Sequence, residues 1–329
     1  MIVSQTPLRI SFLGGGTDFR EFFEKYGGGV VSSAIDKYIF VIVKERFDDM
    51  IYINYSEKEI VSSVDEIKHE LVREAMRMTG VTSGVEITTL ADIPSEGSGL
   101  GSSSSLTVGL LNALYTYAGE PKDPEVLARQ ACEIEIDILG KPIGVQDQYI
   151  AAYGNLRKFD FHKDGTITNR KIKLTMRQFL EMGENMMLFY TFRTRKSESI
   201  LSEQKDNIND KIETLKRMAE LAAEAENCLN NGQLHRLGEL MNEGWRLKKS
   251  LASKIADEEI DKLYDASIEA GALGGKIAGA GGGGFLLTYC RPECRSKLRT
   301  RLSHLRELPF NLEPAGSKII FNYRRNIIK

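Results

Sequence analysis

A run of glycine and serine residues is the segment of this sequence best suited to chemistry. It reads Pro94-Ser95-Glu96-Gly97-Ser98-Gly99-Leu100-Gly101-Ser102-Ser103-Ser104-Ser105 and lies between a predicted strand and a predicted helix. Alternating glycines leave the backbone open to a ligand, because they carry no side chains. The serines begin the helix, where free N–H groups and the helix dipole favour an anion. We therefore expect residues 97–104 to bind phosphate. The alternative is a flexible turn before a well-capped helix.

The glycine–serine loop differs from the two common nucleotide-binding motifs. No Gly-Lys-Ser/Thr follows it, which excludes a Walker A motif. Ser102 occupies the third glycine position of G-x-G-x-x-G, which excludes a dinucleotide fingerprint. Because the loop lacks lysine, triphosphate charge must be met by amides, a serine-ligated metal and a remote cation. A second cluster, Gly279 to Gly284, does match G-x-G-x-x-G, but a strand is predicted after it. We interpret this cluster as a tight turn or a place of close backbone approach.

Three charged residues elsewhere are candidates to complete a phosphoryl-transfer site. Asp147 lies in a stretch interrupted by Gly and Pro, directly after a predicted helix. An aspartate there is either a cap or turn residue or a catalytic base. Glu135 is one of three acidic residues at the end of that helix, and each of them could simply face water. Arg9 lies on an apolar strand beside a glycine turn, where a structural ion pair is the simple alternative.

A basic cluster precedes the long helix expected from Ser197. It consists of Arg193, Arg195 and Lys196. Cations at a helix N-terminus oppose the helix dipole, at a cost of about 0.3 to 1 kcal/mol each when exposed. Such an unfavourable arrangement suggests a bound anion, and we expect the cluster to bind a substrate phosphate. The alternatives are a solvated basic turn, or ion pairs with Glu198 and Glu203.

The order of these segments along the chain resembles that in the GHMP small-molecule kinases. This family includes galactokinases, homoserine kinases, mevalonate kinases and phosphomevalonate kinases. The matching segments are Thr6-Pro7-Leu8-Arg9-Ile10-Ser11-Phe12-Leu13-Gly14-Gly15-Gly16-Thr17-Asp18, the Gly-Leu-Gly-Ser-Ser loop, Gly144-x-x-Asp147-Gln148 and Lys276-x-x-Gly279-x-Gly281-Gly282-Gly283. The resemblance covers nearly the whole chain, and it implies an ATP-dependent kinase that uses Mg²⁺.

The resemblance also implies roles for single residues. Asp147 is similar to the family's aspartate that takes a proton from the attacking hydroxyl, and Arg9 is similar to the cation beside it. Ser103, with Ser102 as second choice, and Glu135 resemble the Mg²⁺ ligands, and hard Mg²⁺ does prefer oxygen ligands. Asp18 resembles the carboxylate that holds sugar hydroxyls. The other positions expected to contact substrate are Gly16, Thr17, Gly144, Gly281 and Gly282.

The opening segment and Ile35-Asp36-Lys37-Tyr38 are most similar to one branch of the family. That branch phosphorylates the anomeric (C1) hydroxyl of D-glycero-D-manno-heptose 7-phosphate, in the synthesis of nucleotide-activated heptose. Galactokinases carry a Glu-His pair where this chain has Gly15 and Gly16, which disfavours galactose. The alternatives are another sugar kinase, of the L-fucose or galactose type, and a non-catalytic regulator that binds nucleotide and sugar. The intact Arg9, Ser103, Glu135 and Asp147 argue against a regulator.

These residues must be positioned by strands and helices, and the sequence predicts an α+β protein. Strands are expected at 9–13, 30–35, 38–43, 85–89, 186–191 and 285–289, and helices behind the glycine–serine loop, at about 124–139 and within 197–251. Asn230-Asn231-Gly232 predicts the turn of a helical hairpin. The family resemblance implies two domains with the active site in the cleft between them. We place an N-terminal ATP-binding domain at 1–170 and a C-terminal domain at 171–329.

Composition limits the classes of partner. The chain has 329 residues, of which 42% are hydrophobic and 27% charged, with a formal net charge of -2. This length exceeds one hydrophobic core and favours two domains. The near-neutral charge argues against a nucleic-acid binder. We expect no membrane partner and a cytoplasmic location, because there is no signal-like N-terminus or spanning apolar run. Four scattered cysteines are typical of free thiols in a reducing compartment. The oligomeric state stays open.

Overall fold

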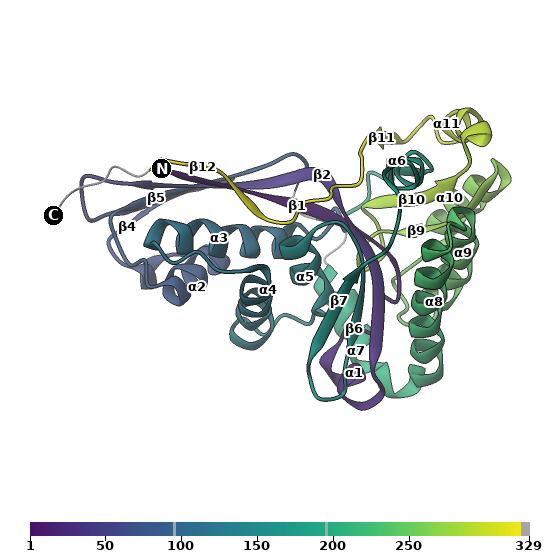
Figure 1. The fold of residues 1–329 in the computed structure, drawn as a ribbon, viewed down its shortest axis with the longest axis horizontal. Coiled ribbons are helices and arrows are strands. Elements are labelled where there is room, and N and C mark those ends of the chain that lie inside the picture. The colour runs from purple at the N-terminus through teal and green to yellow at the C-terminus, as the bar shows by residue number, and fades with distance from the viewer. Residues whose placement is uncertain (95–96, 195–196, 324–329) are drawn as a thin grey trace.

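The computed structural model describes residues 1–94, 97–194 and 197–323, and its elements alternate much as the sequence predicted (Figure 1). The strands are β1 (Ile2–Leu13), β2 (Gly28–Glu45), β3 (Ile51–Asn54), β4 (Lys58–Val61), β5 (Val85–Ala91), β6 (Leu156–Phe161), β7 (Ile167–Lys171), β8 (Met186–Tyr190), β9 (Ala272–Ile277), β10 (Phe285–Cys290), β11 (Arg306–Leu308) and β12 (Lys318–Asn322). The helices are α1 (Arg20–Tyr26), α2 (Glu70–Thr79), α3 (Ser102–Ala118), α4 (Pro124–Cys132), α5 (Gln146–Tyr153), α6 (Met176–Glu184), α7 (Ser197–Asp206), α8 (Ile212–Asn230), α9 (Leu234–Lys249), α10 (Glu258–Glu269) and α11 (Arg295–Arg301). Short 3₁₀ turns lie at Val64–Glu66, Ile208–Lys211 and Pro292–Cys294, and a π-helical turn, Glu133–Ile138, continues α4.

The first sheet is organised around the long strand β2. It pairs with β1 along most of its length, with β6 through its first half and with β5 through its second half. The strand order is β12-β1-β2-β5-β3-β4, and β6 and β7 extend from β2. The sequence predicted two strands, at 30–35 and 38–43. The structure joins them, because the extra residues Asp36 and Lys37 are absorbed by a bulge opposite Pro7 and Leu8 of β1.

Helices cover one face of this sheet. Figure 1 shows α2, α3, α4 and α5 on the same side of β1, β2 and β5. Helix α3 is central to this layer and contacts β1, β2, α2, α4 and α5. Most of its side chains are buried, as expected for a helix enclosed by neighbours. It ends at Gly119, the predicted stop, which adopts the left-handed conformation. The layer therefore fixes the N-terminus of α3, where the glycine–serine loop lies.

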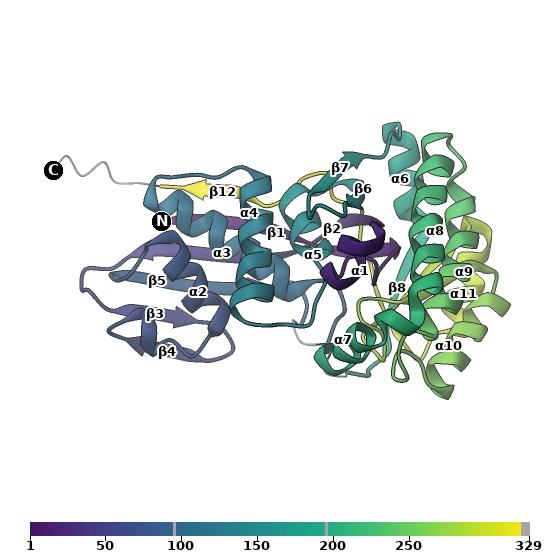
Figure 2. The same ribbon diagram turned by 90° about the horizontal axis from the view of Figure 1, so that it is seen from below.

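The second sheet is smaller and antiparallel, with the order β11-β8-β10-β9. Helices α8 and α9 form the predicted hairpin and run together beside this sheet (Figure 2). Trp245 of α9 is buried in a core that includes Phe189 of β8 and Leu286 of β10. Helix α8 also contacts β1 and β2, so it connects the two halves of the molecule.

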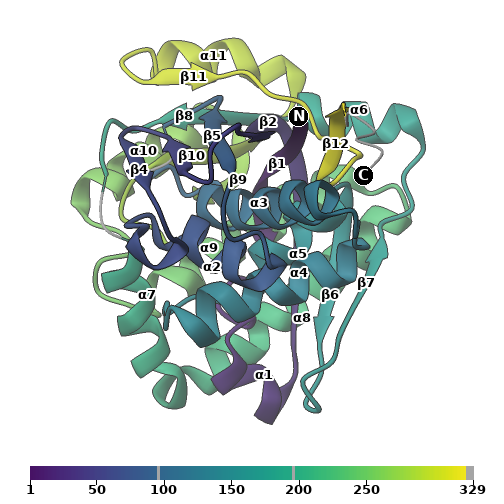
Figure 3. The same ribbon diagram turned by 90° about the vertical axis from the view of Figure 1, so that its left-hand side faces the viewer.

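The end of the chain returns to the first sheet. Strand β12 pairs with β1, and Asn311 and Glu313 bond to Asp36 and to the backbone of Ala34. In Figure 3, β12 lies beside β1, while β11 lies against β8. The sequence predicts residues 171–329 as one C-terminal domain, whereas the first sheet extends through β7 to Lys171 and includes β12. We propose that β12 belongs to the first domain. Within the described ranges, no helix is long and apolar enough to cross a membrane.

Candidate active site

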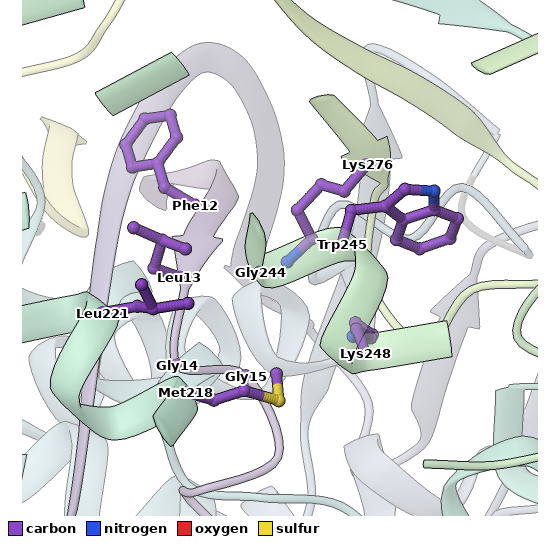
Figure 4. A pocket seen from close by; sticks show the side chains of 10 residues that line it. All are labelled: Phe12, Leu13, Gly14, Gly15, Met218, Leu221, Gly244, Trp245, Lys248 and Lys276. Atoms are coloured by element: carbon purple, nitrogen blue, oxygen red, sulfur yellow. The ribbon is translucent and has the colours of Figure 1, made fainter. Parts of the chain in front are cut away.

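A cavity lies between the two halves of the molecule. Strand β1 and the turn after it, the start of α5, helix α9 and the glycine cluster all contribute to its wall. Its lining residues are Arg9, Ser11, Gly15, Gly16, Asp18, Phe19, Ile143, Gly144, Gln146, Asp147, Leu201, Gln204, Lys248, Lys276, Gly279 and Ala280. A smaller cavity adjoins it and shares Gly15, Lys248 and Lys276 (Figure 4).

Arg9 and Asp147 form a bidentate ion pair in this cavity. Arg9 Nε donates to Asp147 Oδ1 at 2.7 Å, and Arg9 Nη2 donates to Asp147 Oδ2 at 2.5 Å. Arg9 Nη1 donates to the carbonyl oxygen of Gly99 at 2.5 Å. The Asp147 side chain keeps 22% of its surface exposed, against 6% for Arg9. One guanidinium thus connects the glycine–serine loop to a carboxylate that a substrate can reach.

The glycine–serine loop differs in one respect from its predicted form. The N-cap of α3 is Gly101, in the left-handed conformation, and no side chain caps the helix. The first intrahelical bond runs from Ser105 N to Gly101 O, which leaves the N–H groups before it for a ligand. Gly99 is required by packing, since a Cβ there would lie 2.4 Å from Ala278 O and φ is +73°. A substitution of Gly99 would therefore test packing as much as phosphate binding. Ser95 and Glu96 lie outside the described residues.

Ser103 and Glu135 are in contact, although 32 positions separate them. Ser103 Oγ donates to Glu135 Oε1 at 2.5 Å, and Gln148 Nε2 donates to Glu135 Oε2 at 2.7 Å. Burial raises the pKa of Glu135, while the hydroxyl of Ser103 acts against this rise. Ser103 is exposed, whereas Ser102 is buried with its Oγ 3.2 Å from Ser98 Oγ. The geometry therefore favours Ser103 over Ser102 as the serine that faces a ligand.

Asp18 is buried at the other side of the cavity. Its Oδ1 accepts a hydrogen bond from Gly16 N at 2.8 Å, and its Oδ2 accepts one from Gln146 Nε2 at 2.9 Å. Burial raises the pKa of Asp18 above its ordinary value. Gly144 is required here, because a Cβ at this position would lie 2.0 Å from Asp18 Oδ2. Asp18, Gly16 and Gly144 thus all line the cavity, and their contact with substrate stays a prediction.

Two buried lysines in the cavity were not among the predicted site residues. Lys248 of α9 donates from Nζ to Gly279 O at 2.7 Å, and burial lowers its pKa to about 8. Lys276 of β9 is equally buried, and its pKa also lies well below the ordinary value. Lys276 is the first residue of the Lys276-x-x-Gly279 segment that resembles the family. This resemblance was the one sequence feature that could have indicated a role for Lys276 in the site. Lys248 lies three residues after Trp245 and is buried with it on α9. The sequence pattern gives no sign that this lysine is buried in a site, because lysines near the end of an amphipathic helix usually face water.

Three of the predicted substrate contacts are engaged within the protein instead. The hydroxyl of Thr17 donates to Gly14 O and accepts from Gly29 N, so it holds the turn against β2. Gly281 packs on Ile255, and Gly282 N donates to the carbonyl oxygen of Ile255. Among the described residues of the glycine cluster, Gly279 and Ala280 line the cavity. The predicted positions of Thr17, Gly281 and Gly282 in contact with substrate are therefore not supported.

The predicted phosphate role of Arg193 is also not supported. Its guanidinium is ion-paired with both Asp257 and Glu259, and the Asp257 contact is 2.5 Å. These carboxylates already satisfy the charge that was expected to attract an anion. Arg195 and Lys196, the other members of the predicted basic cluster, lie outside the described residues.

A cleft that holds an Arg–Asp pair beside a helix N-terminus with free N–H groups is suited to phosphoryl transfer to a small molecule. Residues 60–155 match the N-terminal domain of GHMP kinases, and residues 218–304 match their C-terminal domain. The chain belongs to the GHMP kinase family and is an ATP-dependent kinase, and its sugar-kinase relatives phosphorylate a hydroxyl acceptor.

Several relatives agree with this assignment. A D-glycero-alpha-D-manno-heptose 7-phosphate kinase of Campylobacter jejuni is 28% identical over 96% of this chain and 98% of its own length. A mevalonate kinase of Methanothermobacter thermautotrophicus is 30% identical over 87% of this chain and 90% of its own. The crystal structure of a D-glycero-D-manno-heptose 1-phosphate kinase from Bacteroides thetaiotaomicron superposes with a TM-score of 0.83, at 24% identity over 98% of this chain and 100% of that one. It confirms the predicted fold.

Proposed function

We propose that this kinase transfers the γ-phosphoryl group of ATP to the anomeric (C1) hydroxyl of a sugar phosphate, D-glycero-D-manno-heptose 7-phosphate. The observation that carries the proposal is the position of Arg9, which bonds both to Asp147 and to the glycine–serine loop. Base and phosphate loop are thereby held together at one wall of the cavity. The heptose 7-phosphate kinase of Campylobacter jejuni, similar along almost its whole length, supports the choice of acceptor.

The residues of the cavity suggest how the transfer proceeds. The sugar binds with its reacting hydroxyl at Asp147, whose partly exposed carboxylate accepts the proton as the hydroxyl attacks phosphorus. Arg9 lies against this carboxylate and offsets negative charge as it develops. Asp18 and Gln146 hold other sugar hydroxyls. The free N–H groups at the start of α3 bind the ATP phosphates. Catalysis then rests on positioning and charge neutralisation, as phosphoryl transfer requires.

We also propose that Ser103 and Glu135 hold Mg²⁺. Their oxygens lie 2.5 Å apart at the N-terminus of α3, beside the proposed phosphate site, and both are hard ligands. Among the described residues, no group of three or more His, Cys, Asp or Glu side chains could hold a metal by itself. That fits an ion held by few protein ligands together with substrate phosphates, as is usual for Mg²⁺. The ion would neutralise charge on the ATP phosphates when bound.

Ser103→Ala tests this assignment. The variant should need about 10- to 100-fold more Mg²⁺ for half-maximal activity, because one ligand oxygen and its contact to Glu135 are lost. The measurement is ADP release against Mg²⁺ concentration at fixed ATP. Ser102→Ala is the matched control, since it removes a hydroxyl from the same helical turn that bonds to Ser98 instead. The same Mg²⁺ requirement in both variants would show that Ser103 is not a metal ligand.

A panel of acceptors tests the function itself. ADP release from ATP should be fastest with D-glycero-D-manno-heptose 7-phosphate, and slower with the unphosphorylated heptose, L-fucose and galactose. A preference for L-fucose or galactose would replace the proposed acceptor with the other sugar-kinase types. ATP and sugar binding without turnover of any acceptor would favour the regulator.

A further inference from the structure

The charges in the cavity wall do not balance. Arg9 and Asp147 neutralise each other through their bidentate pair. Asp18 is then the remaining carboxylate of the lining set, and its oxygens already accept from Gly16 and Gln146. Lys248 and Lys276 are both 5% exposed, and each adds a positive charge when it is protonated. Buried charges are costly unless paired, so an anion bound beside these lysines would stabilise their protonated forms.

Polar side chains of Ser11, Gln146 and Lys248 converge over Gly15. The position that a Cβ of Gly15 would take lies 3.8 Å from Lys248 Nζ, 3.9 Å from Ser11 Oγ and 3.6 Å from Gln146 Nε2. The side chain of Ser11 is buried, and its hydroxyl has no hydrogen-bond partner in the described part of the chain. Lys248 gives one N–H to Gly279 O and keeps others for a ligand. Figure 4 shows Gly15 and both lysines around the adjoining cavity.

We propose that Lys248, Lys276 and Ser11 bind the phosphate of the acceptor that is not transferred, over Gly15. The inference rests on the proposed function and names the part of the site that recognises a phosphorylated sugar. Ser11 lies two residues beyond Arg9 on β1, which is roughly 7 Å along an extended strand. The reacting hydroxyl at Asp147 and an anion over Gly15 therefore lie at separate ends of one acceptor. This subsite takes the role first expected of Arg193.

Loss of either lysine charge tests the subsite. Lys276→Met and Lys248→Met should each raise KM for heptose 7-phosphate by about 10- to 100-fold, because a charge-assisted contact is lost. KM for the unphosphorylated heptose should change less than threefold. Lys158→Met is the control, since Lys158 is equally buried but pairs with Asp160 outside the cavity. Equal losses on both sugars would overturn the subsite and leave the kinase function standing.

Gly15→Ala tests the same space without removing a charge. Its methyl group would make ordinary contacts of 3.6 to 3.9 Å, so the fold should tolerate it. It would nevertheless occupy the place of the ligand, and KM for heptose 7-phosphate should rise at least tenfold. Gly183→Ala in α6 is the matched control, with a Cβ 3.5 Å from Leu312. Unchanged KM in Gly15→Ala would contradict an anion over this residue.

Calorimetry with inorganic phosphate separates failure of this inference from failure of the proposed function. Phosphate should bind the wild-type protein, and it should bind the Lys248→Met and Gly15→Ala variants at least tenfold more weakly. This result is expected whether or not a sugar is turned over. Phosphate binding that is identical in these variants would reject the subsite. Absence of turnover with every sugar phosphate, together with the expected phosphate binding, would reject the function and keep the subsite.

The pH dependence of KM gives an independent readout. The charged groups facing Lys248 are Asp18, Arg9, Asp147 and Lys276, and its pKa is about 8. An anion binds the protonated lysine, and the substrate phosphate is already a dianion at this pH. KM for heptose 7-phosphate should therefore be constant between about pH 7 and pH 8, and rise up to tenfold per unit above pH 8 as Lys248 loses its proton. Lys248→Met should abolish the rise. A rise that persists in this variant would contradict the role of Lys248.

Discussion

Asp147→Asn should lower kcat by roughly 10²- to 10⁴-fold, while the Kd for ATP changes little. Asparagine keeps the shape of the side chain and one hydrogen bond to Arg9, but it cannot accept the proton of the attacking hydroxyl. Because Asp147 lies on α5 and not on the glycine–serine loop, nucleotide binding should survive. The measurement pairs steady-state rates with calorimetric titration of ATP.

Asp137→Asn is the control for that substitution. Asp137 also forms a bidentate pair with an arginine, Arg20, but at an exposed position outside the cavity wall. Loss of such an exposed pair should cost at most about 1 kcal/mol of stability and leave kcat unchanged. More than a tenth of wild-type kcat in Asp147→Asn would exclude Asp147 as the base.

Arg9→Met should lower kcat by about 10²- to 10³-fold, comparable to removing one preorganised donor from a transition state. The variant loses the contacts of the guanidinium to Asp147 and to Gly99 O at once. Asp147 would be left without its neutralising partner, and the loop without one of its anchors. Arg9→Lys should recover only part of the rate, because an ammonium lacks the planar fork that holds both partners.

The matched control for Arg9 is Arg20→Met, which removes the partner of Asp137. Near-normal kcat in Arg9→Met, with only a lowered melting temperature, would contradict the catalytic role. Arg9 would then be a structural bridge between β1 and the loop.

Local sequence signals predicted much of the fold and part of the site. The period of α3, its stop at Gly119 and the hairpin turn before Gly232 follow from local chemistry, and all were predicted. Contact between Arg9 and Asp147, 138 positions apart, followed instead from the family resemblance, since no local rule joins such distant segments. The strand β2 was predicted as two pieces, because a bulge that absorbs Asp36 and Lys37 depends on the partner strand.

What could not be predicted depends on the direction and environment of single side chains. In the sequence, Lys248 resembles a lysine at the polar edge of an amphipathic helix. Only tertiary packing shows that it is buried and faces Asp18. Arg193 looked like an anion binder because its local position opposes a helix dipole. Its partners, Asp257 and Glu259, come from a segment more than 60 residues later. Thr17 fitted the family motif, but its hydroxyl holds the backbone of the turn.

The position of the new phosphate in the product tests the central claim most directly. Purified protein would be incubated with ATP, Mg²⁺ and D-glycero-D-manno-heptose 7-phosphate, and the product analysed by phosphorus and proton NMR. We predict a bisphosphate in which the second phosphorus couples to the proton on C1, and Asp147→Asn should form it at no more than a hundredth of the wild-type rate. A phosphate on any other hydroxyl, or no transfer to this sugar under conditions where L-fucose or galactose is phosphorylated, would contradict the account.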